Sequence, residues 1–70
     1  MLPLSYANVN EANVIKKVTG NLEMKKHLED MGFVTGAVIS VVSTVNGNLI
    51  VNVKDTKVAL DKQLAMKIMI

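Results

Sequence analysis

The 70-residue chain contains no cysteine, no tryptophan and no arginine, and it has one tyrosine, one phenylalanine and one proline. Without cysteine it can form no disulfide, thiolate nucleophile or cysteine-based zinc site. Without arginine it cannot make bidentate guanidinium contacts to guanine or supply an arginine finger to a phosphoryl-transfer site. With two aromatic residues it lacks both a stacking platform for single-stranded nucleic acid and an aromatic groove for proline-rich peptides.

Apolar residues make up half of the chain, and eleven of them are valine, so the core must be built from small branched side chains. The charged fraction is 20%, which is typical of a globular protein. Eight lysines and six carboxylates give a net charge of +2. Because the lysines occur singly or in pairs, the sequence shows no basic cluster of the kind that marks nucleic-acid or membrane binding.

Long apolar runs are also missing. No segment approaches the roughly 20 apolar residues that span a bilayer, and the first ten residues are not typical of a targeting signal. We therefore expect a cytoplasmic protein with no direct membrane insertion. The length predicts one domain covering residues 1–70.

The clearest helical pattern follows Gly20 and Asn21, either of which can act as the N-cap. Its apolar residues recur at i, i+4 and i+7 and form one stripe: Met24, Leu28 and Met31. Gly32 is expected to adopt the left-handed conformation that ends a helix. Phe33 is then the apolar residue that folds back in a Schellman motif.

Two valine-rich segments, residues 37–45 and 49–54, are predicted strands. Between them, Asn46-Gly47 is typical of a type I′ hairpin turn, in which both central residues have positive φ. Alternation in the second strand predicts one buried face: Leu49, Val51 and Val53.

Shorter segments complete the predicted order. Residues 12–19 form a strand with Ile15 on one face and Val14 and Val18 on the other. There follow a turn at 55–57, a short strand at 58–60, a helical turn capped by Asp61 and an edge or closing strand at 68–70. The fold class is therefore mainly β with one or two short helices (α+β), arranged as a small, partly open β-barrel.

Three segments in this order resemble the ferrous iron transport protein A (FeoA) family. Residues 27–36 (HLEDMGFVTG) are similar to the family's run of Arg-Leu-x-x-Leu-Gly, two further residues and Pro-Gly. The strand at 37–45 with the hairpin at 46–48 comes next, and residues 58–70 are similar to the family's C-terminal segment. The resemblance covers residues 3–70 and implies an SH3-like barrel.

Departures from the family pattern are few. Asn10 and Asp55 stand where the family usually has glycine, and both residue types tolerate positive φ, so we expect left-handed backbone at both positions. His27 replaces a usual arginine and Thr35 a usual proline. No polar residue of this chain can therefore be carried over as diagnostic of function.

Catalytic machinery is scarce, and we expect neither an enzyme nor a cofactor. The one histidine, His27, has no nucleophile beside it in the helix. Glu23 and His27, four residues apart and with Asp30 nearby, are weak candidate metal ligands, because two or three ligands on an exposed helix do not complete a site. A solvated helix face is the alternative for them. We interpret the five methionines as packing residues.

The resemblance implies an accessory protein of bacterial ferrous iron uptake that acts on FeoB, a membrane transporter with a GTPase region. Contact with such a partner is assigned to Lys25, Lys26, Glu29 and Phe33, although a solvated helix face accounts equally for the three charged residues. Because the chain has no arginine, we expect any effect on the GTPase to be positional or allosteric.

Two other functions stay open at this point. One is an SH3-like metal-regulator module related to the C-terminal domains of iron-dependent repressors, although no DNA-binding domain accompanies it. The other is a small-barrel nucleic-acid binder, which the shortage of aromatic residues and arginine disfavours. Exchange of the short closing segment at 68–70 between molecules would give a weak homo-oligomer.

Overall fold

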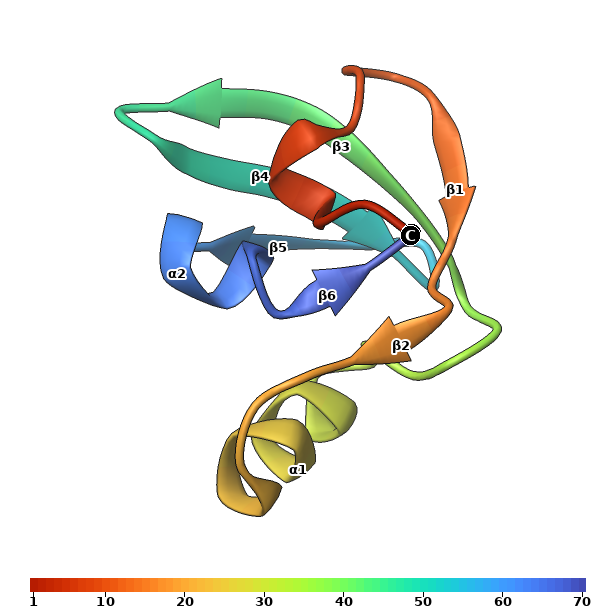
Figure 1. Ribbon diagram of the computed structural model, residues 1–70. Coiled ribbons are helices and arrows are strands. Elements are labelled where there is room, and N and C mark those ends of the chain that lie inside the picture. Colours follow the sequence, from red (N-terminus) through yellow and green to blue (C-terminus); the bar gives the residue numbers. More distant parts are fainter.

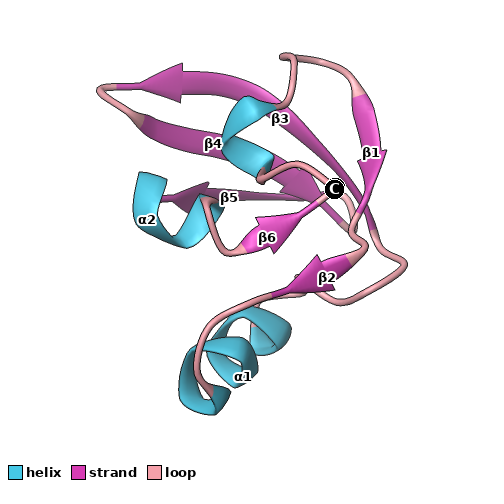
Figure 2. Ribbon diagram, viewed as in Figure 1, coloured by secondary structure: helices cyan, strands magenta, loops and turns pink.

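The structure is a computed structural model that describes residues 1–70. It is mainly β with two short helices, as predicted, and its two sheets form a partly open barrel (Figures 1 and 2). In chain order the elements are η1 (Leu4–Tyr6), β1 (Ala12–Val14), β2 (Lys17–Val18), α1 (Leu22–Asp30), β3 (Val38–Val45), β4 (Asn48–Val53), β5 (Thr56–Leu60), α2 (Lys62–Ala65) and β6 (Ile68–Met69). Neither helix has the length and apolar character needed to cross a membrane.

The strands β3, β4 and β5 form an antiparallel meander, and β1 pairs with β3 at its far edge. The turn between β3 and β4 has positive φ at Asn46 (50°) and Gly47 (84°), so the predicted type I′ hairpin is confirmed. A one-residue irregularity between Val41 and Ser43 interrupts the β3–β4 pairing. Such bulges bend a strand and increase its twist, which suits the curvature of a barrel.

A second tight turn joins β4 to β5 at Lys54 (φ 51°) and Asp55 (φ 61°). The predicted turn at 55–57 is therefore one residue too late, and β5 begins at Thr56. Because lysine rarely adopts positive φ, a turn that begins at Lys54 could not be predicted from the residue types. The left-handed backbone expected at Asp55 and at Asn10 (φ 65°) is confirmed.

The predicted strand at 12–19 is two strands in different sheets. β1 pairs with β3, whereas β2 pairs with β6, and the chain bends between them at Ile15 and Lys16. Ile15 is fully buried at the bend. The expectation that Val14 and Val18 share a face is wrong, because Val14 is exposed while Val18 packs against the core on the other side of the bend.

The two chain ends complete the barrel in an arrangement that we call the terminal closure, consisting of β2, β6 and residues 2–3. β6 pairs with β2 on one side and forms a bridge to Pro3 on the other. Leu2 N donates to Ile70 O at 3.0 Å, and Ile70 N donates to Leu2 O at 2.8 Å. β6 thus has partners on both sides and is the closing strand, which was one of the two predicted alternatives, and not an edge strand.

One core of twelve buried side chains fills the barrel, and none of them is polar. The meander supplies the predicted face of β4, and the terminal segments add Leu4 and Ile68. The members are Leu4, Ile15, Leu28, Phe33, Ile39, Val41, Leu49, Val51, Val53, Leu60, Ala65 and Ile68.

Candidate functional site

The helix α1 projects from the lower side of the barrel in Figure 1 and carries most of the residues assigned to partner binding. Its N-cap is Asn21, whose Oδ1 accepts a hydrogen bond from Met24 N at 2.8 Å. At the other end Gly32 has a φ of 101°, and Phe33 N donates to Leu28 O at 3.0 Å, which is the predicted Schellman motif. Because Leu28 is buried in the core, both ends and the inner face of α1 are fixed.

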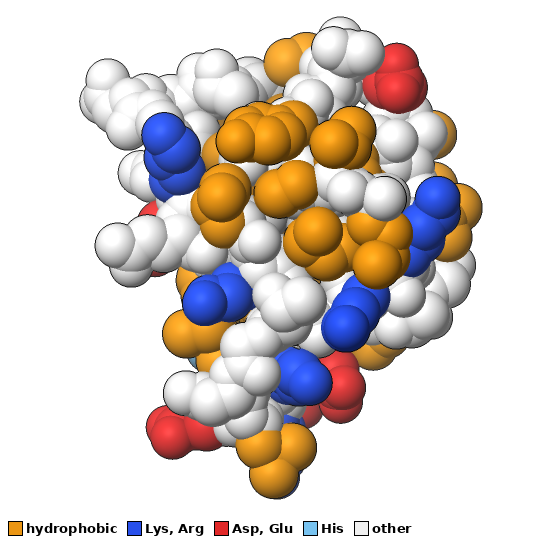
Figure 3. Space-filling view, viewed as in Figure 1, with side chains coloured by type: hydrophobic (Ala, Val, Ile, Leu, Met, Phe, Trp, Pro, Cys, Tyr) orange, Lys and Arg blue, Asp and Glu red, His pale blue; other side chains and the backbone are white.

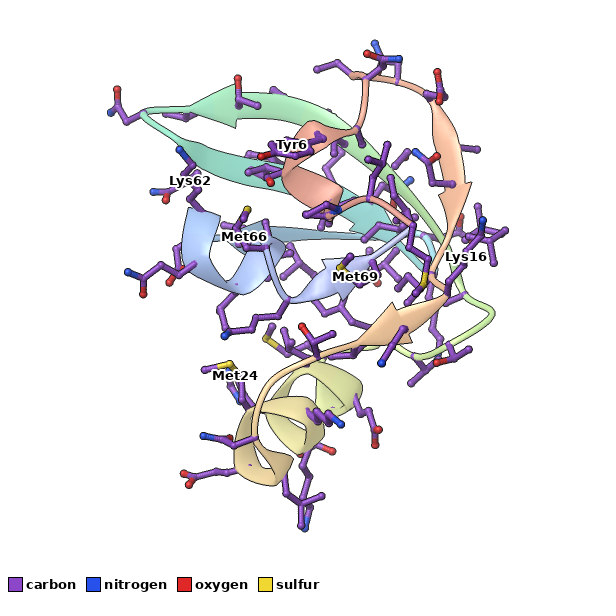
Figure 4. All side chains as sticks on the ribbon, in the orientation of Figure 1. Tyr6, Lys16, Met24, Lys62, Met66 and Met69 are labelled. Carbon is purple, nitrogen blue, oxygen red and sulfur yellow. The ribbon has the colours of Figure 1, made fainter.

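Two adjoining hollows of about 520 and 330 Å³ lie between α1 and α2 and share Met24 and Leu64 as lining residues. We call them together the α1–α2 groove. The labelled Met24 and Met66 lie on the same side of the molecule, as Figure 4 shows. The lining residues are Asn21, Glu23, Met24, His27, Asp61, Gln63, Leu64, Met66 and Lys67.

The groove combines an apolar floor with a rim of both charges. Met24 and Leu64 are half-buried and pack against the core, and methionine adapts its shape to different apolar partners. One rim carboxylate is already engaged, because Asp61 Oδ1 accepts a hydrogen bond from Leu64 N at 2.8 Å and caps α2. The groove therefore offers an apolar contact to a protein side chain, with polar groups around it.

The weak candidate metal ligands, Glu23 and His27, both line the smaller hollow. Nowhere in the structure do three or more His, Cys, Asp or Glu side chains come together in a way that could hold a metal ion. Two ligands on one helix do not fill the coordination sphere of a transition metal. A metal ion bound there would need further ligands from a second molecule.

The residues assigned to partner binding are placed differently from one another. Lys26 and Glu29 are exposed on α1, and Lys25 is half-buried. Phe33 is 0% exposed and belongs to the core, so its assignment to partner binding is wrong. The reason is the Schellman motif itself, which turns the residue after the helix inward.

Several exposed apolar residues were missed as surface features, and Tyr6 and Met66 are among them. Tyr6 is 66% exposed at the end of η1, and Met66 is 41% exposed at the end of α2. The interpretation of all five methionines as packing residues is wrong for Met66 and for Met1, which is 71% exposed. For Met66 the available signal was its position off the apolar stripe of Leu60, Leu64 and Ile68.

The chain is similar to known proteins along nearly its whole length. The family model described as "FeoA domain" matches residues 2–70. A putative Fe(2+) transport protein A from Methanocaldococcus jannaschii is 33% identical over 70 residues, which are all of this chain and 85% of that protein.

Solved structures agree with this match. The crystal structure of an iron uptake regulatory protein (FeoA) is 28% identical, with a TM-score of 0.89 over 97% of this chain and 90% of that chain. The Stenotrophomonas maltophilia FeoA complexed with zinc, described as an SH3 domain protein, is 24% identical, with a TM-score of 0.84 over 99% of this chain and 88% of that chain. The predicted SH3-like fold is thereby confirmed.

Proposed function

Because this chain belongs to the FeoA family, we propose that it is a cytoplasmic accessory protein of ferrous iron uptake that binds or regulates the membrane GTPase transporter FeoB by protein–protein contact. The family match over residues 2–70 is the observation that carries the proposal. The relative named for Fe(2+) transport, 33% identical over the whole chain, supports it further. Ferrous iron is in this proposal the cargo of the transporter and not a ligand of this chain.

The α1–α2 groove and the exposed side of α1 are the surface that we assign to this contact. The groove supplies half-buried Met24 and Leu64 as an apolar floor. Lys26 and Glu29 are three residues apart on α1, so they lie together on the exposed side of the helix, which faces away from Met24 and the groove. An apolar side chain of the partner flanked by charged groups of both signs fits this arrangement.

The proposal assigns the protein a role in binding and not in catalysis. It carries no arginine, so it cannot complete a GTPase site with a guanidinium group, which is worth about 10³–10⁵ in rate. Binding at the transporter can still change the GTPase rate by holding the partner in one conformation. We expect such an effect to be much smaller than that of an arginine finger.

The test is a pull-down of full-length FeoB from the same organism, solubilised in detergent, with and without guanine nucleotide. Lys26→Glu and Glu29→Lys should each weaken binding by about fivefold, because charged pairs at the border of an interface contribute about 1 kcal/mol. Lys57→Glu makes the same charge change as Lys26→Glu, at an exposed position on β5. It is therefore the matched control and should bind normally.

Failure of the unmodified protein to associate with FeoB under any of these conditions would reject the proposal. Equal losses for Lys26→Glu and Lys57→Glu would reject the assigned surface only. A GTPase assay adds a third outcome. If the protein raises the GTPase rate of FeoB by several orders of magnitude and one lysine substitution abolishes this rise, the positional role is contradicted.

The two other functions considered from the sequence gain no support of their own. Tyr6 is the one exposed aromatic residue, because Phe33 is buried, and a single ring does not provide a platform for successive bases. A regulator module would need a ligand set for its metal, and no cluster of three ligands is present.

A further inference from the structure

The fold brings together an apolar patch from three separate parts of the chain: Tyr6, Met66 and Met69. Tyr6 and Met66 are exposed, and Met69 is half-buried on β6. Ser5 Oγ donates to Met66 Sδ at 3.0 Å and so links η1 to the end of α2. Figure 3 shows apolar side chains gathered over η1, α2 and β6 in the middle of this face.

Two lysines border the patch from β2 and the bend before it. Lys17 is directly opposite Met69 in the antiparallel ladder, and such pairs point to the same side of a sheet. The neighbouring pair, Val18 and Ile68, packs in or against the core, so Lys17 and Met69 point outward. Lys16 N donates to Met69 O at 2.8 Å, which places this residue beside the patch as well.

Two further lysines border the patch from α2. Lys62 lies one turn before Met66, whose N donates to Lys62 O at 3.1 Å, and Lys67 directly follows Met66. In Figure 4 the labelled Lys62 and Lys16 lie on opposite sides of the patch. We call the three apolar residues and these four lysines together the Lys–Met face.

Charged residues are distributed unevenly between the Lys–Met face and the rest of the surface. The face holds four of the eight lysines. Asp61, which directly precedes Lys62 and lines a hollow with Met66 and Lys67, lies at its edge and caps α2. The other four lysines share the remaining surface with the other five carboxylates. In Figure 3 the acidic side chains lie at the margins of this view, away from the apolar centre.

We propose that the Lys–Met face docks on the surface of an anionic lipid bilayer. Lysine can lay its aliphatic stem along an apolar surface while its ammonium group reaches lipid phosphates. Tyrosine favours the boundary between headgroups and acyl chains. Of the residues of this face only Met66 and Lys67 line a hollow, so Tyr6, Met69 and the other three lysines lie outside any cleft.

A protein partner fits this face less well. Protein interfaces are enriched in arginine and depleted of lysine relative to the rest of the surface, whereas lysine supplies every charge of this face and the chain has no arginine. The face overlaps the α1–α2 groove only at Met66 and Lys67. The side of α1 that carries Lys26 and Glu29 is separate from it, so a partner can contact that side of α1 while the Lys–Met face is occupied.

The experiment is co-sedimentation of the full chain with vesicles of phosphatidylcholine alone or mixed with phosphatidylglycerol. We expect binding to the mixed vesicles only, weakened by salt. The double variant Lys62→Glu/Lys67→Glu should lose roughly tenfold or more in affinity, since each lysine near an anionic surface contributes about a factor of five. Tyr6→Ser should weaken binding to a smaller extent, which a purely electrostatic association would not show.

Lys54→Glu/Lys57→Glu is the matched control, with the same change in net charge. Lys54 lines a hollow on the outer face of the meander together with Asn52, and Lys57 is opposite Asn52 in the ladder, so both lie away from the Lys–Met face. This control should retain binding within about twofold, as expected for charges beyond the Debye length of the surface. Lys16→Glu/Lys17→Glu provides a second test variant should the half-buried Lys67 prove necessary for folding.

Absence of binding to the mixed vesicles would overturn the inference, and so would equal losses in the test and control variants. Binding of FeoB or of single-stranded DNA through the same lysines, without vesicle binding, would assign the face to that partner instead. The vesicles contain no protein, so the result is independent of the function proposed above.

Discussion

The meander and the terminal closure bury parts of the same core, but they are built in opposite ways. In the meander, strands of five to eight residues follow one another through two-residue turns. In the terminal closure, β2 and β6 have two residues each, and they pair across most of the length of the chain. Each region nevertheless contributes fully buried side chains, such as Val51 in the meander and Ile68 in the closure.

This difference separates two sources of stability. Hairpins close short loops, and their hydrogen bonds form at a small loss of chain entropy. The closure has few ladder hydrogen bonds and must bring distant segments together, so its stability depends on the side chains that it buries. We therefore expect the closure to open more easily than the meander, although the core needs both.

The largest expected effect tests whether the short strands of the closure contribute as much to stability as the long strands of the meander. Ile68→Ala and Leu49→Ala each truncate a buried side chain and should each destabilise the fold by about 2–5 kcal/mol. Since a core of this size supplies about 3–5 kcal/mol in total, both variants should be largely unfolded or close to it. Urea denaturation followed by circular dichroism measures this, with exposed Val45→Ala as the control. A loss below about 1 kcal/mol for Ile68→Ala alone would show that the closure is peripheral.

A smaller effect is expected from removing the bonds between the chain ends. Deleting Ile70 removes both hydrogen bonds with Leu2 and the packing of the half-buried Ile70 side chain, and it should lower the free energy of unfolding by about 1–3 kcal/mol. In the intact protein, amide hydrogen exchange should be faster at Ile70, which bonds to Leu2, and at Thr19, which bonds to Lys67 beside the closure, than at Val51. Equal protection at these three positions would mean that the two regions open together.

The smallest effect concerns the two turns within the meander. Lys54→Asn/Asp55→Gly puts residues that favour positive φ into the second turn and should stabilise the protein by about 1 kcal/mol. The melting temperature should then rise by roughly 4–8 °C. The reciprocal change, Asn46→Lys/Gly47→Asp, should lower it. An unchanged melting temperature in both variants would show that turn conformation contributes little to the stability of the meander.

The elements that could be predicted from the sequence depend on signals a few residues apart. The cap at Asn21, the Schellman glycine and the Asn46-Gly47 turn are of this kind, and all three are present. The bend at Ile15 and the turn at Lys54 are different. They follow from pairing with strands elsewhere in the chain, which forces a residue such as Lys54 into a conformation that it rarely adopts alone.

The surfaces were harder to predict than the fold. The burial of Phe33 followed from the Schellman motif and excluded it from partner contact, so that error was avoidable. That Lys17 and Lys67 lie on one surface could not be predicted from the sequence, because only the terminal closure brings β2 next to the end of α2. Lysines that are dispersed along the sequence therefore say little about the charge pattern of the folded surface.

The pairing of Leu2 with Ile70 also bears on the connectivity of the barrel. Since these residues exchange two hydrogen bonds, a short linker could join the ends, and the chain could be opened at the exposed tip of the first hairpin, between Asn46 and Gly47. In such a circular permutant β6 and residues 2–3 become a local hairpin and β2 lies nearer to β6 along the chain, whereas β3 and β4 become a distant pair. Which strands pair locally would therefore change while the three-dimensional barrel stays the same, because this property depends only on the order of the strands along the chain.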